Sequence, residues 1–408
     1  MKITLVGEIQ EELAVKIFFD HDKRQIIIED SGIGMTKDEL IENLGTIAHS
    51  GSKSFVQDLG ENSQGDNNII GQFGVGFYSS FIVGDYVEVI SKSEQSEKTY
   101  IWSSDGSGTF EISEFDEPMK STGTKIIISL RPDCIEFSSS EEVLKTINKF
   151  SNFINFPIYM NEEKVNVTSA IWTRARYEIT QEEYQKFFEF VSNSKMDYKY
   201  LLHYSTDAPL SIKALLYSPG SHTEKYGMSQ EESKVSLYSK KILIKPDCKE
   251  MLPNWLRFIK GVVDCDDIPL NISRENYQDT NLMLKLKSVL TKRILKMISD
   301  EAEKDPKDYL RWYDEFQYFL KEGAASDPEY SDQLLSLMRF QTSFTNEAIS
   351  LDNYISKLKP EADKIFFILN QTKEGARTSP FMEPFKGTDV FFIQIILDSS
   401  SLCFHACG

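Results

Sequence analysis

The run Asp30-Ser31-Gly32-Ile33-Gly34-Met35 is the first place in this sequence where residue types and spacing suggest chemistry. A carboxylate at the end of a predicted strand can accept a hydrogen bond from an amino group such as that of adenine. The two glycines would let the backbone approach a flat ring and adopt conformations that a side chain forbids. A tight Asp-Gly turn between a strand and a helix explains the pattern equally well, so the run alone indicates little.

A second glycine-rich run, Gly71-Gln72-Phe73-Gly74-Val75-Gly76-Phe77, precedes a predicted helix at Tyr78–Val83. Free backbone amides at such a turn bind anions, so the run is suited to phosphates. A flexible hinge is the alternative, and one element could serve as both. The run has neither the Gly-Lys-Ser/Thr of a Walker loop nor the strand context of a dinucleotide fold. A third element, Gly123-Thr124, could place the Thr124 hydroxyl beside the Asp30 carboxylate.

The composition of the 408 residues disfavours several classes of protein. Lys+Arg number 45 against 63 Asp+Glu, and the net charge of -18 opposes binding to a nucleic-acid backbone. The five cysteines include no Cys-x-x-Cys pair, and neither they nor the five histidines stand at metal-ligand spacing, so we expect no metal-ligand set. The sequence has no run of eighteen apolar residues and therefore predicts no membrane-spanning helix.

The sequence predicts a mixture of strands and helices around the glycine-rich runs. Residues Val15–Asp20 and Gln25–Glu29 predict a hairpin around a polar turn. Thr36 followed by Glu39 is a capping-box pattern, which predicts a helix over Thr36–Leu44. Further strands are expected at Tyr86–Ser91, Thr99–Ser103, Thr109–Ile112 and Thr124–Leu130, and a further helix at Glu141–Phe153.

A polar stretch at Asn161–Asn166 suggests that a first domain covers residues 1–162 and a second α/β domain covers residues 163–390. In the second domain, strands are expected near Tyr200–Tyr204, Ile212–Tyr217, Val235–Ile244 and Lys364–Leu369. Apolar residues at helical spacing predict helices at Asn281–Ala302, Tyr309–Lys321 and Ser331–Phe340. The fold class is therefore α/β (α+β), in two domains.

Taken in order, the two glycine-rich runs and Gly123-Thr124 resemble the ATP-binding fold shared by heat shock protein 90 chaperones, type II topoisomerases, histidine kinases and mismatch-repair proteins. The run Asn43-Leu44-Gly45-Thr46-Ile47-Ala48-His49-Ser50-Gly51, followed by residues 71–79, is similar to the chaperone signatures. Trp255–Asp264 and Ile268–Glu275 resemble the middle-domain signature of the same family. The resemblance covers roughly residues 13–390.

Three shorter runs, at residues 103–108, 151–153 and 203–210, look closest to the mitochondrial, tumour-necrosis-factor-receptor-associated paralogue of this family. The resemblance implies a mitochondrial protein. The first residues are too acidic for an Arg-rich transit peptide, so a cytoplasmic location is the alternative.

The family resemblance implies an N-terminal Bergerat-type ATP-binding α/β sandwich, lacking its first helix, and an α/β middle domain with a helical segment. Asp30 would bind the adenine amino group, with Thr124 supporting it through water. Arg274 would reach the terminal phosphate, assisted by Gln278, although an exposed ion pair is the plainer interpretation of a lone arginine. The residues implied to contact ATP are Asp30, Gly34, Met35, Asn43, Ser50, Gly51, Gly71, Gln72, Phe73, Gly74, Val75, Gly76, Phe77 and Thr124.

Two parts of the family pattern are expected to be missing. The family's first long helix carries a Glu that orients the attacking water and an Asn that helps to hold Mg²⁺, whereas this chain has no Asn before Asn43. Because losing one such positioned group costs roughly 10²–10⁴-fold in rate, we expect ATP with Mg²⁺ as the family cofactor but doubtful turnover. The likeness is expected to stop near Val390, leaving residues 391–408 as an unrelated tail without the dimerisation domain.

The leading functional hypothesis is an ATP-dependent chaperone, an ATPase that acts on unfolded or partly folded protein clients with co-chaperones and forms a homodimer in its family. The alternative is a non-catalytic fragment that binds clients or co-chaperones without turnover. The mismatch-repair or topoisomerase branch predicts affinity for DNA, which the net charge opposes. A histidine kinase would need a phospho-accepting His on a helical hairpin upstream of residue 43, where strand and loop are expected.

Overall fold

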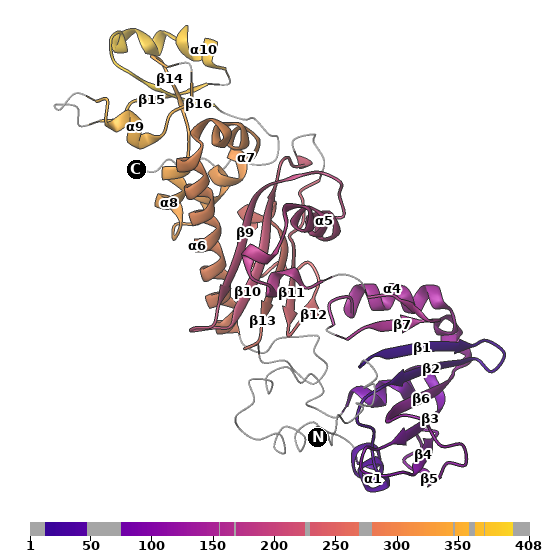
Figure 1. Cartoon of the computed structure of the whole chain (residues 1–408). Coiled ribbons are helices and arrows are strands. Elements are labelled where there is room, and N and C mark those ends of the chain that lie inside the picture. Colours follow the sequence, from indigo (N-terminus) through magenta and orange to yellow (C-terminus); the bar gives the residue numbers. More distant parts are fainter. Residues whose placement is uncertain are drawn as a thin grey trace, which may run out of the picture. The chain divides into compact units, whose positions relative to one another are not determined.

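The computed structural model describes residues 13–46, 75–154, 156–166, 169–224, 229–268, 280–345, 347–358, 364–370 and 372–394. The chain divides into two compact units (Figure 1). The first comprises Met1–Ala170, Tyr238–Ile244 and Leu270–Asn276, and the second comprises Ile171–Leu237, Lys245–Pro269 and Tyr277–Gly408. Within the described residues, no helix is long and apolar enough to cross a membrane.

The first unit is built on a sheet in which eight described strands lie in the order β5-β4-β3-β6-β2-β1-β7-β8. β1 and β7 pair in parallel, and the other neighbouring strands pair antiparallel. The strands are β1 (Val15–Asp20), β2 (Gln25–Asp30), β3 (Gly84–Lys92), β4 (Thr99–Ser104), β5 (Glu111–Glu114), β6 (Gly123–Leu130), β7 (Ile158–Met160) and β8 (Glu163–Lys164).

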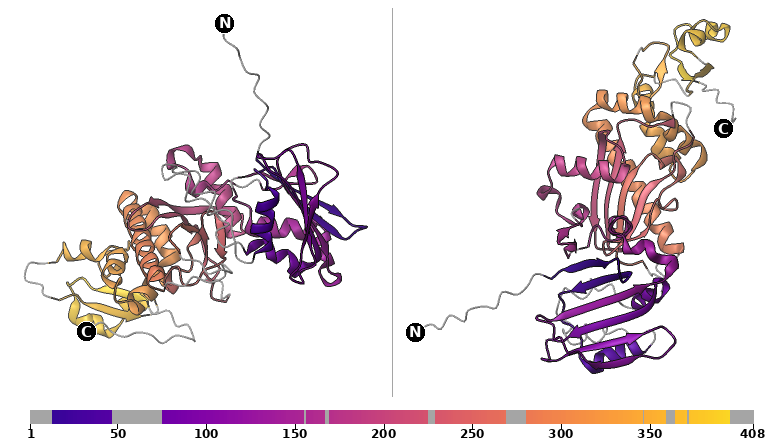
Figure 2. Two further views of the ribbon diagram at one scale, coloured as in Figure 1. Left: turned by 90° about the horizontal axis from the view of Figure 1, so that it is seen from below. Right: turned by 90° about the vertical axis from the view of Figure 1, so that its right-hand side faces the viewer.

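Short helices cover one face of this sheet (Figure 2). Leu40 and Leu44, four residues apart on one helix, are buried in the same core cluster as Val143 and Ile147 of another helix. The sheet contributes buried Val, Ile and Trp side chains from β2, β3, β4 and β6 to this cluster. The helices are α1 (Lys37–Gly45), η2 (Gly76–Ser79), α3 (Ser80–Val83), η3 (Pro132–Ser138) and α4 (Ser140–Phe150).

Local sequence signals account for the elements on either side of the Asp30 run. β1 and β2 pair as an antiparallel hairpin, which confirms the hairpin predicted there. The predicted capping box is also confirmed, because Thr36 Oγ1 accepts the Glu39 N–H at 3.3 Å and Glu39 Oε2 accepts the Thr36 N–H at 2.7 Å. The segment from Asp30 to Thr36 is therefore held between the end of a strand and the first turn of a helix.

The second sheet has five described strands in the order β12-β11-β13-β10-β9. Helix α5 lies on one face of it and α6 on the other (Figures 1 and 2). Buried aromatic side chains of α7, at helical spacing, form much of the core. The elements are η4 (Ile171–Thr173), η5 (Arg176–Glu178), α5 (Gln181–Ser192), β9 (Tyr198–Thr206), β10 (Ile212–Pro219), β11 (Lys234–Ser239), β12 (Ile242–Lys245), η7 (Asn254–Leu256), β13 (Lys260–Cys265), α6 (Thr280–Lys304), α7 (Pro306–Ser326) and α8 (Ser331–Leu337).

One strand of this sheet corrects the sequence prediction. The single strand expected over Val235–Ile244 is two strands, β11 and β12, separated by a turn at Lys240 and Lys241. Both residues have positive φ, at 52° and 66°. A pair of consecutive residues with positive φ is the geometry of a tight hairpin turn, and lysines give no sequence signal for it.

The C-terminal part of the second unit is a small α/β layer, with β14 (Gln341–Thr342), α9 (Leu351–Ile355), β15 (Phe367–Asn370), α10 (Lys373–Arg377), η8 (Pro380–Phe385) and β16 (Phe391–Gln394). β16 is the central strand, parallel to β15 and antiparallel to β14. Phe391, where an unrelated tail was expected to begin, is 2% exposed within this sheet.

Candidate functional site

Three polar side chains, Asp30, Thr124 and Ser91, stand in one row across adjacent strands of the first sheet. Asp30 in β2 lies directly opposite Thr124 in β6, and Thr124 lies directly opposite Ser91 in β3. Directly opposite residues point to the same face, with Cβ atoms about 4.5–5.5 Å apart. The next residues on this face, Ile28 and Val89, are apolar, so the row is a polar band at the end of an apolar surface.

The Asp30 carboxyl is open to a ligand and yet surrounded by protein. The residue is exposed at the surface, while burial of the carboxyl raises its pKa above the usual value of 3.8. Backbone hydrogen bonds from Gly32, at 2.9 Å, and from Thr124 oppose this rise in the pKa. The carboxyl therefore combines an exposed position with partial desolvation by the protein around it, and groups at binding sites often have such a perturbed pKa.

The two glycines after Asp30 are required by the protein's own packing. Gly34 has a φ of 66°, and a Cβ there would overlap the backbone oxygen of Lys92. A Cβ on Gly32 would lie 2.8 Å from the Asp30 Oδ1 atom. The glycines of the Asp-Gly run therefore have the packing role that a tight turn requires. This role also fixes the position of the Asp30 carboxyl, so it is compatible with a binding role.

Two hydrogen bonds hold the turn, one to β3 and one to the residues that follow this strand. The Met35 N–H donates to Ser91 Oγ at 2.8 Å, and the Glu94 N–H donates to the Ile33 carbonyl at 3.0 Å. The Met35 side chain packs against the apolar core. These contacts hold Gly34 and Met35 beside the polar row, where they were predicted to line a base.

Ser91 is the residue of this site that sequence reasoning missed. It is 0% exposed, donates to the Gly123 carbonyl at 3.1 Å and shares a hydrogen bond of 2.9 Å with Thr124 Oγ1. The signal was present in the alternation of β3, in which Val87, Val89 and Ser91 take successive inward positions. A serine that continues a buried apolar series needs hydrogen-bond partners, which a sequence does not identify.

The phosphate run is described only from Val75 onward. Val75, Gly76 and Phe77 stand at the start of η2, and the Tyr78 N–H donates to the Val75 carbonyl at 3.2 Å. The Tyr78 hydroxyl donates to the Leu44 carbonyl at 3.1 Å, which brings η2 to the end of the helix that carries Asn43. The other predicted residues, Ser50, Gly51, Gly71, Gln72, Phe73, Gly74, Arg274 and Gln278, lie outside the described residues.

An apolar cavity of about 370 Å³ opens on the same face of the sheet. Ile26 and Ile28 line it, and Asp30 follows them at the next alternate position of β2. Residues Ser79, Ser80, Ile82 and Val83 of η2 and α3 form another wall. None of Asp30, Thr124 and Ser91 lines this cavity, which is centred on the Ile26–Ile128 pair, four residues along each strand from the Asp30–Thr124 pair.

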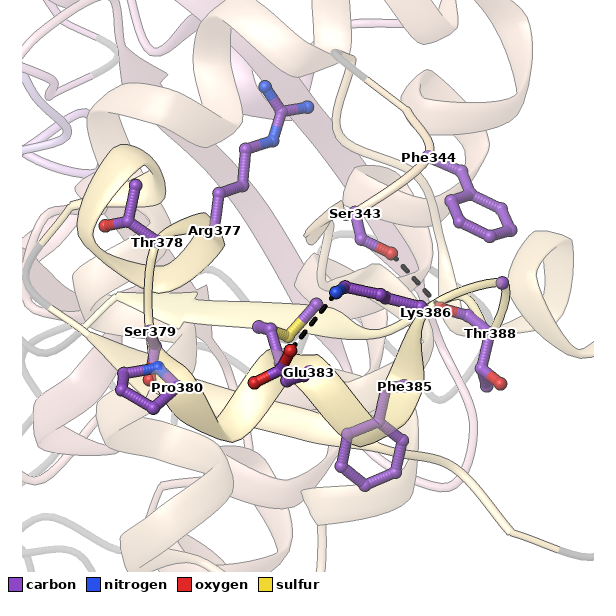
Figure 3. A pocket seen from close by; sticks show the side chains of 12 residues that line it. Ser343, Phe344, Arg377, Thr378, Ser379, Pro380, Glu383, Phe385, Lys386 and Thr388 are labelled. Atoms are coloured by element: carbon purple, nitrogen blue, oxygen red, sulfur yellow. Dashed lines mark hydrogen bonds and ion pairs between the residues drawn. The ribbon is translucent and has the colours of Figure 1, made fainter.

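A second cavity, also of about 370 Å³, lies in the C-terminal layer of the second unit (Figure 3). Its Lys386 pairs with Glu383 at 3.3 Å, and both side chains are more than three-quarters exposed. Solvated, paired charges provide little directional recognition, so we place the candidate site at the Asp30 row. Within the described ranges, no three His, Cys, Asp or Glu residues are grouped so that they could hold a metal ion.

Comparisons with known proteins show the family of the chain. A family model described as "Histidine kinase-, DNA gyrase B-, and HSP90-like ATPase" matches residues 11–120, which include Asp30 and Ser91 but end before Thr124, and it defines the class of the first unit. A second model, described as "Hsp90 protein", matches residues 159–402. The chain belongs to the Hsp90 protein family. The second match also runs past Val390, where the likeness was expected to stop.

Individual relatives confirm the resemblance to the mitochondrial paralogue. The chain is 45% identical, over 94% of its length, to a mitochondrial TNF receptor-associated protein 1 homolog of Dictyostelium discoideum. It is 44% identical over 92% of its length to the chaperone protein HtpG of Desulfitobacterium hafniense, and 38% identical over 98% to a mitochondrial heat shock protein 75 kDa of Bos taurus. It spans 55%, 62% and 58% of the lengths of these three relatives.

Proposed function

We propose that the first unit binds ATP, with the adenine amino group donating a hydrogen bond to the Asp30 carboxylate. The observation that carries this proposal is the row of Asp30, Thr124 and Ser91 at the end of an apolar surface that includes Ile28 and Val89. Asp30 and Ser91 lie in the segment that matches an HSP90-like ATPase model. The residues fit the base, because an amino group needs acceptors and a purine ring needs apolar walls.

In this proposal, residues of the chain have distinct tasks. Asp30 orients the base, the turn at Gly34 and Met35 borders it, and Asn43 faces the ribose. The backbone from Gly71 to Phe77, together with Ser50 and Gly51, holds phosphates, and Arg274 with Gln278 contacts the terminal phosphate. Bound ATP with Mg²⁺ would supply the phosphoanhydride bond whose hydrolysis drives the conformational work of the protein.

We propose further that the protein is an ATP-dependent chaperone that binds unfolded or partly folded clients and co-chaperones and acts as a homodimer. The family membership of the chain and its similarity to a bacterial chaperone protein HtpG support this. A domain boundary near residue 162 is supported by the division of the chain into units between Ala170 and Ile171. Mitochondrial names among the relatives support a mitochondrial location, with the cytoplasm as the alternative, and imaging of a tagged chain tests it.

Isothermal titration calorimetry with ATP tests the binding proposal. We expect saturable binding by the wild-type chain and at least a hundredfold weaker binding by Asp30→Asn. The asparagine side chain replaces one carboxylate oxygen by an NH₂ group, which either faces the adenine amino group, donor against donor, or removes one acceptor from the site. Asp20→Asn is the matched control, because Asp20 also ends a strand and accepts a backbone N–H, from Lys23 at 3.0 Å, at the far end of the hairpin. Equal binding by all three proteins would refute the proposal.

A non-catalytic protein that binds clients or co-chaperones without turnover is the second candidate function. Phosphate release under saturating ATP separates the two functions. Release that Arg274→Ala abolishes supports turnover, whereas binding without release, combined with suppression of client aggregation, supports the non-catalytic protein.

A further inference from the structure

We propose that Ser91 is a positioning residue that fixes the direction of the Thr124 hydroxyl proton and thereby makes the site prefer a 6-amino purine to a 6-oxo purine. The inference rests on the proposed ATP binding, because it concerns the base held at Asp30. It assigns the specificity of the site to a buried residue that touches no ligand itself.

The hydrogen bonds around Ser91 determine the direction of two hydroxyl protons, that of Ser91 and that of Thr124. The Met35 N–H donates to Ser91 Oγ at 2.8 Å and occupies one lone pair. The Gly123 carbonyl, at 3.1 Å, can only accept, so it takes the single hydroxyl proton of Ser91. The remaining neighbour, Thr124 Oγ1 at 2.9 Å, must then be the donor in its bond to Ser91.

The consequence falls on Thr124. A threonine hydroxyl has one proton, and here that proton points to the Oγ atom of Ser91, which is 0% exposed, whereas Thr124 itself is 7% exposed. The hydroxyl oxygen therefore offers lone pairs, and no donor, toward the open side of the row. Asp30, directly opposite in the sheet, offers carboxylate lone pairs as well. The row presents acceptors only.

An acceptor-only row distinguishes purines by the group at position 6. The amino group of adenine donates and matches it, directly or through a water molecule. The carbonyl of hypoxanthine or guanine accepts, so it would face lone pairs and lose its own hydrogen bond on leaving water. Sites built to bond one partner of a donor–acceptor pair reject the inverted analogue more strongly than apolar shape does.

Ser91 also anchors the turn through Met35, and this second role must be separated from the first. Losing the anchor would weaken the binding of every purine nucleotide to the same degree, because it displaces the wall of the site. Losing the fixed direction of the proton would change the ratio of the Kd values for a 6-oxo and a 6-amino purine nucleotide, because the Thr124 hydroxyl could then rotate and donate to a carbonyl. The ratio of the Kd of inosine triphosphate to the Kd of ATP is therefore the informative measurement.

Calorimetric titrations of the 408-residue chain with the two nucleotides provide the test. We expect wild type to prefer ATP, Ser91→Ala to lower this preference by about tenfold, and Ser91→Thr, which keeps a hydroxyl, to restore it. Ser104→Ala is the matched control, since Ser104 is another buried serine that donates to a carbonyl, that of Thr109 at 2.6 Å, and accepts the Gly106 N–H at 3.1 Å, away from the row. It should leave the ratio unchanged.

A double-mutant cycle decides whether Ser91 acts through Thr124. In a Thr124→Val background, which removes the hydroxyl and keeps the shape, Ser91→Ala should change the ratio no further. An equal loss of affinity for both nucleotides in Ser91→Ala, or a further change of the ratio in the Thr124→Val background, overturns the inference alone. Wild-type chain that binds neither nucleotide overturns the proposed function and the inference with it. Near-UV circular dichroism confirms that each variant is folded.

Discussion

Asp30 bears a free-energy cost that the fold by itself does not require. Burial raises the pKa of its carboxyl, and the backbone hydrogen bonds from Gly32 and Thr124 reduce this rise without removing it. A group whose pKa is higher in the folded state destabilises that state once it is ionised. Such a cost is typical of residues kept for binding or catalysis, in which stability is lost to function.

Replacing Asp30 by Asn should therefore separate stability from binding. Below the usual pKa of 3.8 the carboxyl is neutral in both states, so wild type and Asp30→Asn should unfold at the same denaturant concentration. As the pH rises through the higher folded-state pKa, wild type loses stability relative to the variant, and the difference levels off above that pKa. Urea titrations between pH 3 and pH 8, without nucleotide, measure it. A wild-type chain more stable than the variant at pH 8 would contradict the prediction.

Residue types and spacing predict part of this site, but they do not predict contacts between strands that are distant in the sequence. The sequence predicts that Asp30 and Thr124 lie together, because one follows and the other begins a predicted strand next to glycines. Ser91 is not predicted to join them, although its position in the series Val87, Val89, Ser91 is visible in the sequence. The pairing of β3 with β6 decides which residue faces Thr124, and strand register between distant segments is not a local property.

Among the elements, those with strong local signals were predicted within a residue or two. The hairpin β1–β2 and the capped helix α1 are examples. Helix α5 is not among the predicted elements, although Thr180 and Glu183 form the same capping box as Thr36 and Glu39. Strand β13, in which every residue is buried, shows no polar alternation that would mark it as a strand.

Arg257, in the run Trp255–Asp264 that resembles the family signature, has a structural role in a buried ion cluster. Arg257 is 3% exposed and contacts Glu224 Oε1 and Glu322 Oε2, each at 2.8 Å. It also stacks over the Phe319 ring at 4.6 Å. Removing one member of a buried ion group leaves its partners charged and desolvated, which costs far more than losing a surface pair.

Arg257→Met should accordingly lower the free energy of unfolding by roughly 3–5 kcal/mol, measured from urea denaturation. Arg311→Met serves as the control, because Arg311 is 76% exposed and pairs with Asp308 at 2.8 Å, and its loss should cost about 0–1 kcal/mol. Adding Glu224→Gln and Glu322→Gln to Arg257→Met should recover part of the loss, since no unpaired charge is then buried. Equal effects of the two arginine substitutions would show that the Arg257 cluster is not desolvated.

For the whole molecule, the division into two compact units predicts that unfolding need not occur in one step. The four tryptophans report on the units separately. Trp102 lies in the first unit, whereas Trp172, Trp255 and Trp312 lie in the second. Fluorescence of Trp102→Phe therefore follows the second unit alone, and the difference from wild type follows the first.

If ATP binds at the Asp30 row, it should stabilise only the unit that contains the row. A ligand that binds the folded state at 100 times its Kd stabilises it by about 2.7 kcal/mol, so the thermal transition lost in Trp102→Phe should move up with ATP while the remaining transition stays in place. Asp30→Asn should abolish the shift, and Asp20→Asn should keep it. A shift of the transition that persists in Trp102→Phe would mean that ATP is bound by the second unit or that the two units unfold together. In Ser91→Ala, ATP should raise the temperature of this transition by less than it does in wild type, because the fixed Thr124 acceptor and the hydrogen bond to Met35 are both lost.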